Sequence, residues 1–289
     1  MTHGGTLMSS NDREAVRVFY DAYGEREWER LVATPRTRVA YEVHRHFLDS
    51  YVSPGNHVLE IGAGPGRFTL DLAQYGATVD VTDISSVQLE LHRRFVGATN
   101  AESAVLSRKP LDVCDTSMIP ENAYDVVVAY GGPLSYAFEE LESAFAGLVR
   151  ITRPGGYIVA SVMSRWGTWR WALPAVIEEA REYGEDLNDQ ILDTGDLRLS
   201  GANHICQMFQ SRDIEPLVTA AGATLIHMSA SNWASLGDED VLAELEKDPQ
   251  RWERFIANEI RACAEPGALD GGTHILFAAR VPHEASESS

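Results

Sequence analysis

The sequence contains only three cysteines, Cys114, Cys206 and Cys263, and none of them forms a C-x-x-C pair. Such scattered cysteines offer no disulfide framework, and they favour a reducing, cytoplasmic setting. No apolar run approaches the roughly 18 residues of a membrane span, and the first residues lack the apolar core of a secretory signal. We therefore expect a soluble protein without a membrane partner.

Basic residues are also scarce. Lysine and arginine total 24 against 43 aspartates and glutamates, so the formal net charge is −19. A surface of this sign repels a phosphate backbone, and no nucleic-acid partner is expected. Metal-ligand spacings are missing as well: His44 and His46 stand two apart on an expected helix and cannot face one another, so no metal is predicted.

Strand-like and helix-like segments alternate along the 289 residues. Apolar strand patterns occupy 58–61, 78–82, 100–106, 124–130, 157–162, 224–228 and 273–279, and helical patterns occupy 67–75, 87–96, 139–151, 214–221 and 238–263. Alternation of this kind predicts an α/β, Rossmann-like, mostly parallel seven-stranded sheet with helices on both faces.

Five regions follow from this pattern. Two helices interrupted by Pro35 are expected before the first strand, and a tryptophan-rich, then acidic stretch breaks the alternation later. The regions are an N-terminal helical cap (1–50), a core (51–163), an inserted lid (164–213), the completion of the sheet (214–281) and a disordered tail (282–289).

A glycine-rich turn follows the first strand, with the spacing Glu60-x-Gly62-x-Gly64-x-Gly66. Alternate glycines let the backbone approach a ligand, and the next helix offers unpaired N–H groups to it. A dinucleotide fingerprint would place a small residue where Arg67 stands, which disfavours a nicotinamide-dependent oxidoreductase.

The turn resembles the first motif of class I S-adenosylmethionine-dependent methyltransferases. Further segments are similar to bacterial small-molecule methyltransferases of the ubiquinone/menaquinone-methylase type, and the likeness covers most of the chain from residue 19 to residue 280. These segments are Phe19-Tyr20, the run 27–31, Pro35, Arg38, Glu42, the run 131–136 and the run 161–165. The resemblance also implies a last strand that runs antiparallel between its neighbours.

S-adenosylmethionine is the cofactor that this resemblance implies, with S-adenosylhomocysteine as product. Asp83 ends the second strand, where an acid is expected to bind the ribose hydroxyls, or else to cap the next helix. By resemblance Asp115 contacts the adenine, with Asp112 as its competitor, and Arg38 meets the methionine carboxylate, or else forms a surface ion pair. The full expected set is Tyr20, Trp28, Arg38, Glu60, Gly62, Ala63, Gly64, Gly66, Asp83, Ile84, Asp115, Thr116, Tyr130 and Gly131.

Tyr20 and Trp28 are equally explained as apolar staples of the cap. Trp166, Trp169 and Trp171 have three interpretations: lid aromatics over the acceptor, a homodimer contact, or packing inside the insertion. If they are helical, Trp166 and Trp169 share a face.

His204 and Tyr136 are the candidate catalytic residues, because a hydroxyl acceptor gains from a nearby base whereas an amine needs only to be neutral. No Asn-Pro-Pro-Tyr run follows the strand at 124–130, and its place is taken by Tyr130-Gly131-Gly132-Pro133. We therefore expect O- or N-methylation of a small molecule such as a secondary metabolite. The alternative is a protein that binds S-adenosylmethionine without transferring its methyl group.

Overall fold

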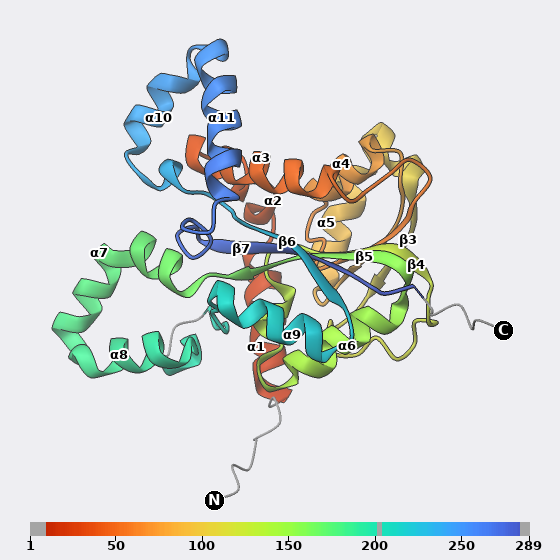
Figure 1. Cartoon of the computed structure of the whole chain (residues 1–289), viewed down its shortest axis with the longest axis horizontal. Helices are drawn as coiled ribbons and strands as arrows, with labels where there is room; N and C mark the ends of the chain where they lie inside the picture. The colour runs from red at the N-terminus through yellow and green to blue at the C-terminus, as the bar shows by residue number, and fades with distance from the viewer. Residues whose placement is uncertain (1–9, 201–203, 284–289) are drawn as a thin grey trace, which may run out of the picture.

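The computed structural model describes residues 10–200 and 204–283. Its centre is a sheet flanked by helices (Figure 1). The sheet has seven strands in the order β3-β2-β1-β4-β5-β7-β6. The strands are β1 (His57–Ile61), β2 (Thr78–Asp83), β3 (Val105–Pro110), β4 (Tyr124–Ala129), β5 (Thr152–Met163), β6 (Thr224–Ala230) and β7 (His274–Arg280). The predicted fold class is confirmed.

The first five strands are parallel, and β7 is antiparallel to both β5 and β6. The expected reversal of the last strand is thus confirmed. In the register, Glu60 of β1 lies between Val81 of β2 and Val128 of β4. The carboxyl ends of the three central strands therefore meet at one edge, beside the change in strand order between β1 and β4.

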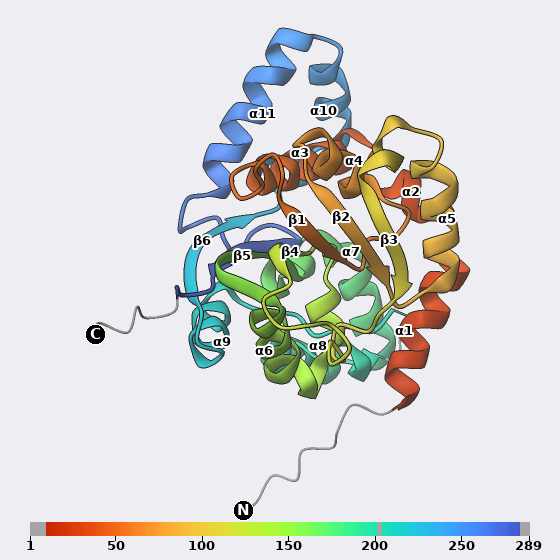
Figure 2. The same cartoon turned by 90° about the vertical axis from the view of Figure 1, so that its right-hand side faces the viewer.

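Helices cover both faces of the sheet (Figure 2). On one face lie α3 (Pro35–Asp49), α4 (Arg67–Gln74) and α5 (Ser86–Val96), and their apolar side chains pack with those of β1, β2 and β4. On the other face lie α6 (Leu141–Ile151) and α9 (Ile214–Ala220), which pack around Phe145 and Phe277. The central strands are buried on both sides, as their unbroken apolar runs indicate.

The cap contains three helices instead of the expected two: α1 (Ser10–Tyr23), α2 (Arg26–Arg30) and α3. Pro35 does not interrupt a helix but begins α3, because proline is favoured in a first turn, and Thr34 forms a capping box with Thr37. Gly24, with a φ of 57°, separates α1 from α2.

Two other boundaries differ from expectation. The segment 100–106 is mostly a short 3-10 helix (Asn100–Ala104), and β3 begins only at Val105. The helix predicted over 238–263 is two helices, α10 (Glu239–Glu246) and α11 (Pro249–Cys263). Asp248 caps α11 by accepting from the backbone N–H groups of Gln250 and Arg251, and Pro249 cannot continue the preceding helix.

The stretch predicted as an insertion contains α7 (Arg165–Tyr183) and α8 (Glu185–Thr194), which contact each other and extend away from the sheet (Figure 1). Of the tail predicted to be disordered, residues 284–289 lie outside the described residues. Within the described residues, no helix combines the length and apolar composition needed to cross a bilayer.

Candidate functional site

A cavity opens at the carboxyl ends of β1, β2 and β4, where α1 and α2 close over the sheet. It encloses about 700 Å³ between its lining atoms, counting the space at its mouth, which is a usual size for a small-molecule site. Its walls come from the cap, from three strand ends and from the loop after β3. They are Arg13, Val16, Tyr20, Glu27, Arg30, Ile61, Gly62, Gly64, Asp83, Ile84, Leu111, Asp112, Val113, Tyr130, Gly131, Pro133 and Tyr136.

The glycine turn forms the floor of this cavity. Gly62 has a φ of 69°, and a Cβ built on it would lie 2.6 Å from Cγ of Pro133. Gly66 has a φ of 100°, and its Cβ would lie 2.5 Å from Val96 and 2.7 Å from His92. Both positions therefore require glycine for conformation and for space, and the turn packs closely between the loop after β4 and helix α5.

Asp83 is buried at the end of β2 and accepts hydrogen bonds from the backbone N–H groups of Gly64 and Ser85, each at 2.8 Å. Burial raises the pKa of its carboxyl to about 6; the two N–H donors oppose this shift, whereas Glu27 and Asp21 add to it. Asp83 does not serve as the N-cap of the next helix, because the N-cap residue of α5 is Ser85. Asp83 instead borders the cavity and ties its two strand-end loops together.

Other expected cofactor residues lie behind the cavity wall. Glu60 is 2% exposed and accepts a hydrogen bond of 2.5 Å from the Thr69 hydroxyl. Ala63 donates its N–H to the Thr82 carbonyl and does not line the cavity, nor does Gly66. These residues shape the turn from outside.

The loop after β3 presents Asp112 and Val113 to the cavity, and not Asp115. The Asp115 carboxylate is exposed and accepts from the N–H and hydroxyl of Ser117. Thr116 is buried on the side of α6, where its carbonyl accepts from Arg150. The Asp115 side chain therefore lies outside the cavity, and its competitor Asp112 borders it.

Trp28 and Arg38 do not line the cavity. Trp28 stacks on Phe95 with ring centroids 4.6 Å apart, and the Arg67 guanidinium lies 3.8 Å from the Trp28 ring centroid. Arg38 forms two hydrogen bonds of 2.5 Å to Glu246. The alternatives of a cap staple and a surface ion pair therefore describe these two side chains better.

Glu27 and Arg30 of α2 line the cavity, and sequence reasoning gave them no role. Nε and Nη2 of Arg30 donate to the Glu27 carboxylate at 2.8 and 2.6 Å. Their i, i+3 spacing predicts the pair on any helix. It could not predict which side of a five-residue helix faces the site.

A chain of hydrogen bonds joins the expected catalytic residues. The hydroxyls of Tyr20 and Tyr136 are 2.6 Å apart, and the Tyr136 hydroxyl is 2.9 Å from Nε2 of His204. Gln88 positions Tyr20 by donating to its backbone carbonyl. Burial raises the pKa of Tyr136 well above its usual value, while burial and the Arg30 charge lower the pKa of His204. The chain therefore holds protonated tyrosines beside a neutral imidazole.

The remaining expected residues lie at the end of β4. The Tyr130 hydroxyl donates to the His44 carbonyl at 3.3 Å, and the ring borders the cavity. The N–H of Gly131 donates to the Ser161 hydroxyl, and a Cβ on Gly131 would meet nothing within 4 Å. This stretch of backbone is thus open to a ligand.

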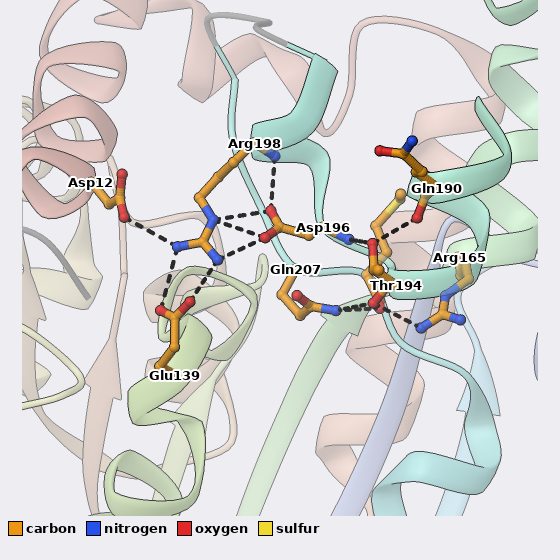
Figure 3. A network of polar contacts seen from close by, with 9 residues as sticks. Asp12, Glu139, Arg165, Gln190, Thr194, Asp196, Arg198 and Gln207 are labelled. Atoms are coloured by element: carbon orange, nitrogen blue, oxygen red, sulfur yellow. Dashed lines mark hydrogen bonds and ion pairs between the residues drawn. The ribbon is translucent and has the colours of Figure 1, made fainter. Parts of the chain in front are cut away.

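An arginine network surrounds Arg198, in the segment that follows α8 (Figure 3). The Arg198 guanidinium pairs with Asp196, with Glu139 before α6, and with Asp12 of α1, at 2.7, 2.7 and 3.2 Å. Close by, the N–H of Gln207 donates to the Ser135 carbonyl. The network joins the cap and the insertion over one end of the site.

The three tryptophans of α7 are 41%, 37% and 54% exposed in the order Trp166, Trp169, Trp171, so packing inside the insertion is wrong. Trp166 and Trp169 share a face as expected, with ring centroids 6.3 Å apart. None of the three borders the cavity. Within the described residues, no three histidine, cysteine, aspartate or glutamate side chains gather as a metal site would need.

Residues 58–156, which include the glycine turn, Asp83, Asp112 and Tyr130, match the family of the methyltransferase domain. Over about a third of its length the chain is therefore similar to a methyltransferase domain. Its similarity to one curated protein, the tuberculostearic acid methyltransferase UfaA1 of Mycobacterium tuberculosis, is 29% identity over 138 residues. The match covers 47% of this chain and 30% of that protein, so the chain corresponds to less than a third of its length.

Solved structures share the fold at low sequence identity. One is a chain of the complex between the Haloferax volcanii Trm112 methyltransferase activator and the protein assigned as a methyltransferase. Its TM-score is 0.60 at 17% identity, and the match covers 94% of this chain and 100% of that chain. Another is the [4+2]-cyclase SpnF, with a TM-score of 0.53, 15% identity, and coverage of 84% and 81%. The cofactor of the methyltransferase family is S-adenosylmethionine.

Proposed function

We propose that this protein transfers a methyl group from S-adenosylmethionine to a small-molecule acceptor by in-line displacement. The observation that carries the proposal is one cavity that joins the glycine turn, Asp83 and Gly131 to the hydrogen-bonded Tyr136 and His204. Cofactor residues from three strand ends thus face the same space as the Tyr136 hydroxyl, and His204 lies behind that hydroxyl, outside the cavity lining.

The lining residues fit the cofactor. Asp83 would accept from the ribose hydroxyls, and the backbone that borders the cavity at Gly62, Gly64 and Gly131 would lie along the methionine part. We propose Asp112, in place of Asp115, as the acid at the adenine end. When bound, S-adenosylmethionine supplies an electrophilic methyl carbon on a positively charged sulfur.

In such a displacement the protein chiefly positions the acceptor and excludes water. The cap closes over the sheet, and Tyr20 and Tyr136 border the space that an acceptor would enter. A hydroxyl acceptor would pass its proton through the Tyr136 hydroxyl to Nε2 of His204, whose lowered pKa leaves it neutral and able to accept at neutral pH.

The acidic surface and the covered cavity both support a small acceptor over a nucleic acid. The name of the curated relative contains tuberculostearic acid, so long-chain acids and their derivatives belong among the acceptors to be screened.

Calorimetric titration with S-adenosylmethionine and S-adenosylhomocysteine tests the cofactor assignment. We expect both to bind, and binding to weaken in Asp83→Asn and Asp112→Ala but not in Asp115→Ala, because the Asp115 carboxylate is exposed outside the cavity. Equal losses for the variants of Asp112 and Asp115 would contradict the proposed adenine end.

An acceptor screen then tests transfer itself, with methylated product detected by mass. We expect Tyr136→Phe to lower kcat while the affinity for S-adenosylhomocysteine stays unchanged. The second candidate is a cofactor-binding protein with another activity, since the same fold also carries a [4+2]-cyclase. Cofactor binding without any methylated product would favour that candidate.

A further inference from the structure

The Glu27–Arg30 ion pair is oriented across the cavity. Glu27 lies over the glycine turn, since its Cγ is 3.5 Å from where a Gly64 Cβ would stand. Arg30 uses Nε and Nη2 for Glu27, and within the described residues no protein group accepts a hydrogen bond from its Nη1. The pair therefore has a negative end toward the cofactor residues and a cationic nitrogen left for a ligand.

Three imidazoles lie at the positive end. Burial lowers the pKa of His44 to about 4 and of His274 to about 3, and it also lowers the pKa of His204. The Arg30 charge lowers the pKa of all three, and at His204 its influence exceeds the opposite one of Glu27. The His44 and His274 ring centroids are 6.1 Å apart. None of the three borders the cavity, but each is a neutral imidazole under the influence of the Arg30 charge.

Glu27 is the charged side chain over the glycine turn. It lies beside Gly64, whose N–H donates to the Asp83 carboxylate, and it raises the pKa of Asp83. The sulfonium and ammonium groups of the cofactor would face Glu27, whereas the Arg30 charge acts on Tyr136 and His204, and Arg30 and Tyr136 border the same cavity. A cationic amine acceptor would be repelled there, and an anion would be attracted.

We propose that the acceptor is an acidic hydroxyl compound, such as a phenol or an enol, and that Arg30 Nη1 and the Tyr136 hydroxyl bind its oxygen as an oxyanion. This inference rests on the proposed function and deepens it, because it selects O-methylation over N-methylation. Hydrogen bonds to a charged acceptor are the stronger ones.

The step balances without another reactant. The acceptor hydroxyl gives its proton through Tyr136 to His204, and the acceptor oxygen forms the new bond to the methyl carbon. The electron pair of the broken carbon–sulfur bond stays on sulfur, which becomes a neutral thioether. His204 then releases its proton to solvent. Arg30 does not change protonation and acts as an electrostatic anchor.

The test uses the protein saturated with S-adenosylhomocysteine and 4-nitrophenol as the probe, because the phenolate is visible by its absorption. We expect saturable binding of the phenolate, at least about tenfold weaker in Arg30→Met, because this variant loses a charge-assisted hydrogen bond. Binding of 4-nitroaniline, which has the same shape without an acidic oxygen, should change less than about twofold.

Arg38→Met is the matched control. Arg38 also lies in the cap and also pairs with a glutamate through two hydrogen bonds, but it does not border the cavity. We expect it to leave phenolate binding unchanged. Retained binding of S-adenosylhomocysteine in each variant shows that the variant is folded.

A second arm asks whether Arg30 holds the methionine carboxylate instead. 5′-Methylthioadenosine keeps the adenosine and the thioether but lacks that carboxylate. If Arg30→Met weakens S-adenosylhomocysteine and not 5′-methylthioadenosine, the inference is overturned. Two other results also overturn the inference: the phenol binds only in its neutral form, or it binds equally well to wild type and Arg30→Met. A larger nitronaphthol is tested alongside 4-nitrophenol, and failure of both to bind the wild type overturns the inference as well. Failure of the wild type to bind S-adenosylhomocysteine would instead overturn the proposed function.

Discussion

Replacing Glu60 by glutamine tests the electrostatics behind the glycine turn. Glu60 is almost fully buried, and the Thr69 hydroxyl donates to its carboxyl group. Burial raises the pKa of Glu60 from its ordinary 4.5 to about 8; the hydrogen bond from Thr69 opposes this shift, and the nearby Asp71 and Asp83 add to it. The carboxyl is therefore largely protonated in the folded protein at neutral pH.

The sign of the effect on stability follows from this shift. A carboxyl whose pKa is higher in the folded than in the unfolded state opposes folding as pH rises, because the unfolded chain ionises first. For Glu60 the cost is absent well below pH 4.5, grows up to about pH 8 and is then constant. At about 1.4 kcal/mol per pKa unit the full cost is at most about 5 kcal/mol, and about 3 kcal/mol of it arises between about pH 5 and about pH 8.

Glutamine cannot ionise, and its amide oxygen can still accept from Thr69. Its N–H groups would lack partners, which costs about 1 to 3 kcal/mol at every pH. The absolute stability of Glu60→Gln is therefore less informative than its pH dependence. We expect the free energy of unfolding of the variant, relative to wild type, to rise by about 3 kcal/mol from about pH 5 to about pH 8.

Urea denaturation over this pH range measures the difference. Glu90→Gln is the control, since the Glu90 side chain is 69% exposed and should follow the wild-type curve. Asp71 and Asp83 titrate in both proteins, so their contributions largely cancel when the curves are subtracted. A difference between Glu60→Gln and wild type that stays constant with pH would refute the reasoning.

Three further outcomes are expected. Asp83→Asn should weaken S-adenosylhomocysteine binding about 10- to 100-fold in calorimetry. Binding to the wild type should weaken as pH falls below about 6, where the Asp83 carboxylate is protonated. Wild-type binding that does not change with pH would contradict the ribose role. Gly66→Ala should lower the free energy of unfolding by roughly 2 to 4 kcal/mol. Gly55→Ala should lower it less, because Gly55 has a similar φ but nothing within 4 Å of its Cβ position. Equal losses in the two variants would show that the close packing around Gly66 is unimportant. Arg198→Ala should speed the release of S-adenosylhomocysteine by roughly 3- to 10-fold in stopped-flow fluorescence, because partly exposed ion pairs contribute little each. Arg181→Ala, which removes an exposed ion pair on α7, is the control and should leave the release rate unchanged. An unchanged release rate in Arg198→Ala would mean that the network does not hold the site closed.

Much of the fold and part of the site could be predicted from local patterns. The turn from Gly62 to Gly66 and the acid at Asp83 follow from the chemistry of a strand that ends in a glycine turn, and both border or shape the cavity. Strand periodicity and turn chemistry act over a few residues, so they are visible in the sequence. Two helix boundaries were wrong: Pro35 begins a helix instead of interrupting one, and Pro249 begins a second helix where one continuous helix was predicted.

Pairings between distant segments could not be predicted in this way. Asp112 and Asp115 have the same side chain three residues apart, and only the path of the loop brings Asp112 to the cavity. Arg38 meets Glu246 more than two hundred residues later, while Arg30 is left facing the site. The contact of Tyr136 with His204 depends on how the insertion returns to the core.

The sequence by itself therefore determined the sheet, the glycine turn and the acid that follows β2, because these depend on backbone conformation and burial within short segments. Only the tertiary structure decided which charged side chains enter the cavity and which pair outside it. Packing of α2 over Gly64, rather than residue type or spacing, orients the Glu27–Arg30 pair across the site.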